Sequence, residues 1–478
     1  MSELIFQILR SQGADVLPLL KEGFDGSGKR DMARRVQLMD AIAGAGENDF
    51  YLSKLDGAEK EVRSALIYAL RHDENNARKL VELCQTERGS AKKAAHWALA
   101  RLKSDIAWGY WDALAEKDLK QAISYMALST APRAGDLVAR GLDQWLTNYE
   151  GLAGAGLKAE DVEQLQSLLY ALPGKTGDAI CTVYRRMAAL GTGLDSVSYA
   201  APNGQRMAMR LEAAESRKDN LAFSQVIPVI LRRSILLNPA PELMALAREL
   251  GRNQGFYQIP AVTSALLSGS SEEAFAAAEP WLRTAGLVVK RRPKESIVIL
   301  SWALQDISWN EKLGALAFQV TFADPAAGRI QISRPVREPL DQRWYQYLMA
   351  PGGDEHMDAA LSLLMDPGDA ALCEQVGRYF YKRALTVSDN SPYLSYLRKC
   401  RWTDCKGLLE AYCKHNKVNT WAFADYLERM PGSPADRAAE AERVLSLIQS
   451  KKIPVGTWNP TQIEKRIAAL RGQTMKAY

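Results

Sequence analysis

Apolar side chains follow a helical rhythm along most of this chain, and the pattern is clearest between residues 61 and 142. One stripe, with apolar or small residues at i, i+3, i+4, i+7 and i+8, occurs there three times at nearly constant spacing. This spacing places all five positions on one face of an amphipathic helix. The three copies are Val62, Ala65, Leu66, Ala69 and Leu70; Ala91, Ala94, Ala95, Ala98 and Leu99; and Leu119, Ala122, Ile123, Met126 and Ala127.

A second stripe follows each copy and indicates a partner helix. Its members are Ala77, Leu80, Val81 and Cys84; Ile106, Gly109, Tyr110 and Ala113; and Ala134, Leu137, Val138 and Gly141. Each unit is therefore expected to be a pair of helices. Because one pair cannot bury its own apolar face, neighbouring pairs should stack, and the pattern predicts an all-α fold built as an α-solenoid.

The three copies resemble HEAT repeats. The dipeptides 62–63, 65–66 and 69–70 match the first-helix pattern of that family, and Lys92 and Lys120 recur where Arg63 stands. The resemblance implies stacked antiparallel helices with a groove that binds partners. No regularly placed acidic partner accompanies the basic positions in the sequence.

Beyond the repeats, the helical rhythm is looser and is broken once. Phe318, Val320 and Phe322 alternate with polar or small residues, and Ile330 and Ile332 alternate again after a turn-forming segment, which predicts a β-hairpin. Residues 191–205 are expected to form a loop, and Ser270, Ser433 and Asn459 are expected to cap helices. The predicted regions are 1–146, HEAT-like repeats; 161–310, helical and repeat-like; 311–345, the β-hairpin insertion; and 346–478, C-terminal helices.

Composition narrows the functional class. The chain has 478 residues, of which 61 are basic and 56 acidic, so the formal charge of +5 is small for a dedicated nucleic-acid binder. Its six cysteines include several on predicted apolar helix faces, which favours a reducing compartment, and we expect a cytoplasmic protein. The most apolar stretch, residues 226–237, is too short and too charged to span a membrane.

Two segments partly match a phosphate-binding P-loop. Residues 23–29 have the glycine and lysine spacing, but Arg30 stands where a hydroxyl should hold magnesium. Gly174, Lys175 and Thr176 supply the hydroxyl but lack the first glycine. Both segments are better interpreted as turns between helices, and we expect no cofactor.

Other groups of reactive side chains have simpler explanations. Cys400, Cys405, Cys413 and His415 are four potential zinc ligands, but their spacing differs from a zinc knuckle, and buried thiols are the preferred interpretation. Glu355, His356 and Asp358 fit an acidic first turn of a helix. No complete catalytic motif is present, so an enzyme is the less favoured interpretation.

Two sets of surface residues are candidates for binding a partner. Arg63, Lys92 and Lys120 would form a basic row along the stack, and Tyr68, Trp97 and Tyr125 an aromatic row. Alternatively, the aromatic side chains seal the seams between units and the cations pair locally. The second set is Arg398, Lys399, Arg401 and Trp402, in a basic segment with interleaved aromatics that also fits a solvated helix face.

The sequence thus favours a non-catalytic scaffold that binds a protein partner in the groove of a helical-repeat superhelix. The alternative is a nucleic-acid-binding α-solenoid, similar to the HEAT-like DNA glycosylases in using cationic and aromatic rows. That alternative predicts binding that weakens steeply with salt and is lost when Arg63, Lys92 and Lys120 are reversed in charge.

Overall fold

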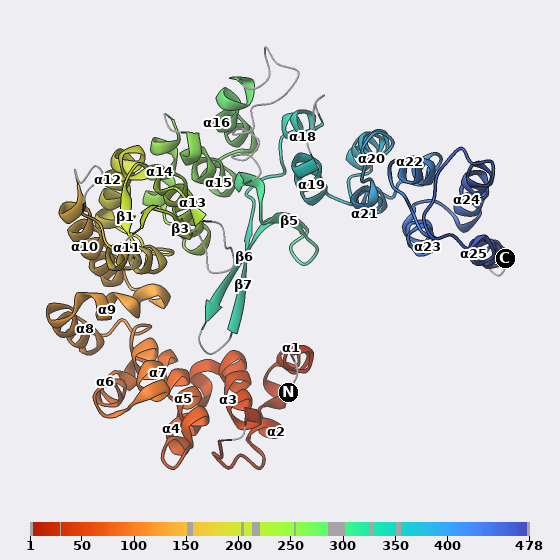
Figure 1. Ribbon diagram of the computed structural model, residues 1–478. Helices are drawn as coiled ribbons and strands as arrows, with labels where there is room; N and C mark the ends of the chain where they lie inside the picture. Colours follow the sequence, from red (N-terminus) through yellow and green to blue (C-terminus); the bar gives the residue numbers. More distant parts are fainter. Residues whose placement is uncertain are drawn as a thin grey trace. The chain divides into compact units, whose positions relative to one another are not determined.

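The computed structural model describes residues 3–28, 30–150, 156–201, 205–212, 220–252, 255–284, 302–324, 328–349 and 355–475. The chain is mostly helical, with small antiparallel sheets (Figure 1). The predicted all-α class is therefore confirmed at this coarse level. Within the described residues, no helix combines the length and the apolar character needed to cross a bilayer.

The chain divides into two compact units, which are described separately. The first comprises residues 1–280 and 318–337, and the second comprises residues 281–317 and 338–478. The helices that begin the first unit are α1 (Glu3–Ser11), α2 (Leu17–Lys21), α3 (Arg30–Ala43), α4 (Asn48–Leu55), α5 (Lys60–Ala69), α6 (Ala77–Thr86), α7 (Gly89–Leu99), α8 (Asp105–Lys117), α9 (Leu119–Ser124) and α10 (Pro132–Tyr149). They are followed by α11 (Ala159–Ala171), α12 (Asp178–Asp195), α13 (Phe223–Leu237), α14 (Pro241–Gly251), α15 (Gln258–Ser268) and α16 (Ser271–Thr284).

The six helices predicted from the repeated stripes, α5 to α10, are all present. Helix α5 packs against α3 on one side and α7 on the other, and α6 packs against α7 and α8. The stripe residues Val62, Leu66, Ala95 and Leu99 are fully buried at these contacts. Periodicity of the apolar residues was thus sufficient to locate these helices, because each buries one face against its neighbours.

Helix α13 is enclosed by its neighbours and packs against α12, α14 and α15. Nearly every side chain along it is buried, including Ile227 and Leu231, so it lacks a polar face. The one charged side chain buried with them, Arg232, donates from Nε to the Thr263 hydroxyl at 3.3 Å and lies 5.5 Å from the centre of the Phe318 ring. A helix that is apolar all round must be surrounded by other elements, which explains this position.

The predicted hairpin is formed by β6 (Ala315–Asp324) and β7 (Gly328–Pro335), and β5 (Ile307–Asn310) completes a sheet in the order β5-β6-β7. Phe318 and Val320 are buried, as their alternation predicts. The Arg334 side chain fixes the hairpin to the end of α13 by donating to the carbonyl groups of Leu236 and Leu237 at 3.1 and 2.8 Å.

The expected loop at residues 191–205 was wrong in part. Helix α12 continues to Asp195, and two short strand pairs follow it: β1 (Ser198–Ala200) with β2 (Arg206–Ala208), and β3 (Leu211–Glu212) with β4 (Asn220–Leu221). Gly191 lies inside this helix, next to Ser224 of α13. The strands are short and mostly exposed, so they carry little alternation that a sequence pattern could reveal.

The second unit contains the helices α18 (Gln342–Leu348), α19 (Glu355–Leu364), α20 (Ala370–Ala384), α21 (Ser391–Lys399), α22 (Leu408–His415), α23 (Thr420–Arg429), α24 (Pro434–Gln449) and α25 (Pro460–Met475). Helix α20 packs on α21 and α22, α23 on α25, and α24 on α25. The caps expected at Ser433 and Asn459 are present: Ser433 Oγ accepts from Asp436 N at 3.2 Å, and Asn459 Oδ1 from Gln462 N at 3.4 Å. In the first unit, Ser270 likewise caps α16 by accepting from Glu273 N at 3.1 Å.

A buried carboxylate joins three helices of the second unit. Asp358, expected as part of an acidic first turn, does lie in the first turn of α19 and is completely buried. It accepts hydrogen bonds from Tyr379 at 2.6 Å, from Arg383 Nε at 3.0 Å, and from the Tyr393 hydroxyl. The sequence pattern could not reveal this role, because the partners come from α20 and α21.

Replacing Asp358 with alanine should destabilise the second unit strongly. Arg383 and Tyr393 would lose their buried carboxylate partner, and breaking such an ion pair costs about 3–5 kcal/mol. Urea unfolding of the full chain measures this loss. Glu355→Ala, one turn earlier on the same helix and exposed, is the matched control and should change stability by less than about 0.5 kcal/mol. Equal losses in the two variants would contradict the assigned role of Asp358.

Candidate functional site

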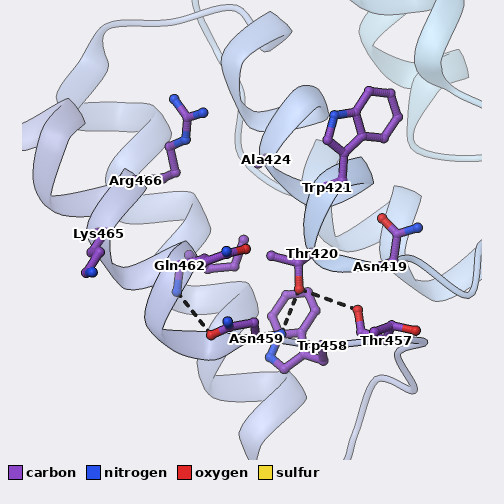
Figure 2. A pocket seen from close by; sticks show the side chains of 11 residues that line it. Asn419, Thr420, Trp421, Ala424, Thr457, Trp458, Asn459, Gln462, Lys465 and Arg466 are labelled. Atoms are coloured by element: carbon purple, nitrogen blue, oxygen red, sulfur yellow. Dashed lines mark hydrogen bonds between the residues drawn. The ribbon is translucent and has the colours of Figure 1, made fainter.

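A cleft of about 680 Å³ lies in the second unit, where the first turns of α23 and α25 come together (Figure 2). Residues 419–424 form one side, and the segment 457–459 with the first turns of α25 forms the other. The cleft is larger than the two other described cavities, of about 190 and 500 Å³. Its size is in the range that accommodates a small ligand or a short segment of a partner.

Backbone hydrogen bonds hold the floor of the cleft. Gly456 N donates to the Val418 carbonyl at 2.8 Å, and Thr420 N donates to the Thr457 carbonyl at 3.1 Å. The Thr420 hydroxyl accepts from Asn459 N at 2.7 Å and donates to the Thr457 carbonyl at 3.4 Å (Figure 2). The segments that precede the two helices are therefore joined by four hydrogen bonds, and the distance between the two helix starts is fixed.

Asparagine side chains cap both helices at this floor. Asn419 Oδ1 accepts from Ala422 N at 2.8 Å at the start of α23, and Asn459 performs the same role for α25. These caps satisfy backbone N–H groups that a bound anion could otherwise use. Neither helix start is therefore an empty anion site.

Two indole rings and two cations shape the walls. Trp421 stands out from α23 and is 74% exposed, more than any other large hydrophobic side chain among the described residues (Figure 2). Trp458 is half-buried and packs edge-on against Phe423, with ring centres 5.3 Å apart. Lys465 and Arg466 extend from α25, and Arg466 forms a 2.8 Å ion pair with Glu428, which lies outside the lining.

The chemistry of this lining is suited to binding. The described side chains around the cleft provide amides, hydroxyls, indoles and cations, and include no histidine, cysteine or carboxylate. General acid–base or nucleophilic catalysis by a side chain most often uses one of those missing groups. The arrangement can hold a ligand through stacking, hydrogen bonds and positive charge.

Sequence reasoning did not identify this cleft. It placed Asn459 as a cap but did not single out Trp421, whose exposure depends on the packing of α23 against α25. The sequence offered one signal for the cleft, which was a tryptophan in the first turn of a helix. Trp421 comes two residues after the capping Asn419, in a segment that follows polar residues.

The three cations of the basic row lie in three different environments. Arg63 is half-buried and donates from Nε and Nη2 to Glu87 Oε1 at 2.9 and 2.5 Å, and from Nη1 to the Leu55 carbonyl at 2.6 Å. This ion pair fits the alternative in which the cations of the row pair locally. Lys92 is half-buried on α7, while Lys120 is exposed on α9 and lines the cavity of about 190 Å³.

The aromatic row is packed into the seams between helices. Tyr68 is only 2% exposed, and the Arg71 guanidinium lies 4.0 Å from its ring centre. Tyr125 stacks on His96 with ring centres 4.5 Å apart, and Trp97 lies edge-on to Tyr125 at 6.5 Å. These contacts favour the structural alternative for the row, in which its members stabilise neighbouring helices.

The second candidate set does not form one surface. Arg398 donates to the Glu428 carbonyl at 2.8 Å, whereas Lys399 donates from Nζ to the Ser362 carbonyl at 2.5 Å, and burial lowers the Lys399 pKa. Arg401 and Trp402 line the cavity of about 500 Å³. Trp402 packs against Tyr381 with ring centres 5.6 Å apart, and Arg401 has a left-handed backbone with φ of 55°.

The cysteines do not assemble as metal ligands. Cys400, Cys405 and Cys413 are all buried, and burial raises their pKa values to about 12, 11 and 12. Within the described parts of the chain, no group of three or more histidine, cysteine or acidic side chains could hold a metal ion. Cys400 contacts Met365 at 3.7 Å, as expected for a thiol in an apolar core.

Neither P-loop-like segment has the geometry of a phosphate cradle. The carboxylate of Glu59 accepts a hydrogen bond from Gly28 N at 2.9 Å and so occupies the position that an anion would need; Lys29 lies outside the described residues. Lys175 is 2% exposed, and its Nζ donates to the Ala127 carbonyl at 3.4 Å. Burial, with a smaller effect of the nearby Arg101, lowers the Lys175 pKa to about 7.

The buried Lys175 predicts a pH-dependent stability. In the unfolded chain its pKa returns to about 10.4, so between about pH 7 and pH 10 the unfolded state binds a proton that the folded state does not. Stability should therefore rise with pH in this window. Lys175→Met should raise the free energy of unfolding by about 1–3 kcal/mol at pH 7 or below, and the gain should shrink towards pH 10.

Chemical unfolding of both proteins at a series of pH values measures this difference. Lys103→Met, at an exposed lysine of the same unit, should be neutral at every pH. A gain from Lys175→Met that is independent of pH would show that lost strain, and not the buried charge, is the cause.

Comparison with known proteins adds no family assignment, since no protein-family model matches the chain and no curated protein is significantly similar to it. The resemblance of residues 61–142 to HEAT repeats therefore stays a prediction.

Proposed function

We propose that this chain is a non-catalytic binding scaffold, a HEAT-like α-solenoid that holds a protein partner through the cleft between α23 and α25. One observation carries the proposal: the 74% exposed indole of Trp421 stands at the wall of a cleft of about 680 Å³. Tryptophan is among the residues that most often dominate binding energy at protein interfaces.

The exposure of Trp421 is unfavourable in the free protein. Covering an apolar surface is worth about 25 cal/mol per Å², and a tryptophan side chain presents some 150–250 Å². A partner that covers the exposed 74% of the side chain therefore gains on the order of 3–5 kcal/mol beyond its polar contacts. Among the tryptophans of the second unit whose burial the structure describes, all except Trp421 are buried, as Trp344 is, or half-buried, which supports a separate role for Trp421.

The scaffold part of the proposal is supported by the order of helix contacts. Within the first unit, α3, α5 and α7 pack in sequence, and α6 packs on α7 and α8. Such nearest-neighbour packing is typical of solenoids, which expose a long surface to partners. All six cysteines are buried thiols, in keeping with the proposed location in the reducing cytoplasm.

The nucleic-acid alternative receives less support. Its basic row requires free cations, but Arg63 is neutralised by Glu87, and its aromatic row requires open ring faces, but Tyr68 is buried under Arg71. Binding of single strands relies on exposed aromatic platforms along a cationic groove. Arg63 therefore provides no free cation for such a strand, and Tyr68 provides no open ring face.

Trp421→Ala should abolish or weaken partner capture by the full chain. Affinity capture from a native lysate, with and without nuclease, would compare the wild type with the variant. We expect a protein band that persists after nuclease treatment and falls at least tenfold with Trp421→Ala, because about 3–5 kcal/mol of contact is lost.

Leu363→Ala is the matched control, since Leu363 is another exposed apolar side chain of the second unit, 42% exposed on α19. It should leave capture unchanged. A partner lost equally in both variants, or lost after nuclease treatment, would refute the proposal. Urea unfolding of both variants shows whether the fold is intact.

A further inference from the structure

We infer that the α23–α25 cleft recognises an acidic peptide segment in extended conformation. The inference rests on the proposed function, since it specifies the partner chemistry of the same site. Three features of the lining point to this ligand: its charge, its amide groups and its indole ring.

The charge of the lining is positive. Lys465 and Arg466 are its ionisable side chains, and the described residues around the cleft include no carboxylate. Arg466 pairs with Glu428, but both side chains remain more than half exposed, at 62% and 54%, so an incoming carboxylate can reach the guanidinium.

The amide side chains match the backbone of an extended peptide. Asn419 and Asn459 use their Oδ1 atoms as caps, and the Gln462 carboxamide reaches from α25 towards Thr420 (Figure 2). A side-chain amide presents a donor and an acceptor, as a peptide group does. An extended segment has no internal hydrogen bonds, so its peptide groups need such partners.

The aromatic content distinguishes a peptide from a nucleic-acid strand. A strand requires several stacking platforms and a line of cations that follows its phosphates. This cleft offers one highly exposed indole, Trp421, and two cations on one helix. One indole beside a polar floor is sufficient for a proline or aliphatic side chain between acidic residues.

Fluorescence anisotropy of the full-length chain with two decapeptide libraries tests this inference. The libraries share randomised Ala, Leu, Pro and Tyr positions and differ only in fixed positions, which are Glu in one and Gln in the other. We expect about tenfold tighter binding of the Glu library, corresponding to one or two charge contacts. Lys465→Glu should remove this preference, and Trp421→Ala should weaken the binding of both libraries.

Lys452→Glu is the matched control, because Lys452 is an exposed lysine near the end of α24 that does not line the cleft. It should retain the preference for Glu. Equal losses in Lys452→Glu and Lys465→Glu would indicate general attraction between opposite charges and would overturn the inference. Tighter, Trp421-dependent binding of oligothymidylate would overturn it in favour of a nucleic acid.

The inference can fail without the proposed function failing. Equal binding of the Glu and Gln libraries, together with partner capture that still depends on Trp421, would remove the acidic preference and leave a protein-binding cleft. Capture that does not depend on Trp421 would remove the proposed function itself.

Discussion

Each helix of this protein has an apolar face that only a neighbouring helix can cover, and this constraint determines most of the structure. Helix α5 illustrates it, because it buries its stripe between α3 before it and α7 after it. Contacts between neighbours in sequence supply the packing that a single core supplies in a compact domain. Helix α13 is the exception: nearly all of its side chains are buried, and it therefore lies inside the first unit.

Two buried carboxylates, Asp40 and Asp358, form hydrogen bonds that connect helical segments distant from each other in the sequence. Asp40 of α3 accepts two hydrogen bonds from Arg71, at 2.9 and 2.8 Å, and lies 2.8 Å from His72 Nε2. Burial alone would raise the Asp40 pKa, but the hydrogen bond with His72 and the charge of Arg71 outweigh it and hold the pKa below its usual value. Its contribution to stability is therefore present near neutral pH and is lost as the pH falls through that lowered pKa. Asp358 has a comparable position in the second unit, where it joins α19 to α20 and α21.

The sequence predicted the elements whose signal is local and missed the contacts made between distant residues. The stripes located α5 to α10, and the alternation of Phe318 and Val320 located the hairpin, because burial of one face leaves a period in the sequence. Arg63 was a candidate for an open basic row, and nothing in a periodic pattern shows that Glu87, from the turn before α7, is the partner that reaches its guanidinium. For the same reason, the interpretation of Asp358 as part of an acidic first turn did not reveal its buried partners. The sequence around Trp421 predicted a helix and nothing more. The exposure of its indole became evident only in the structure, where α25 lies beside α23.

The same distinction explains why we propose the cleft, and not the predicted rows, as the binding site. Aromatic residues at repeated positions lie where successive helices meet, so packing uses them: Tyr125 stacks on His96, and Tyr68 is covered by Arg71. Trp421 lies at the start of its helix, where the facing segment is held by the Thr420 and Thr457 hydrogen bonds and leaves the ring uncovered. Because those bonds fix the floor before any partner arrives, binding would order few protein groups, and less of the contact energy would be lost to entropy. A binding residue in a helical protein of this kind is therefore found by its departure from the repeated pattern.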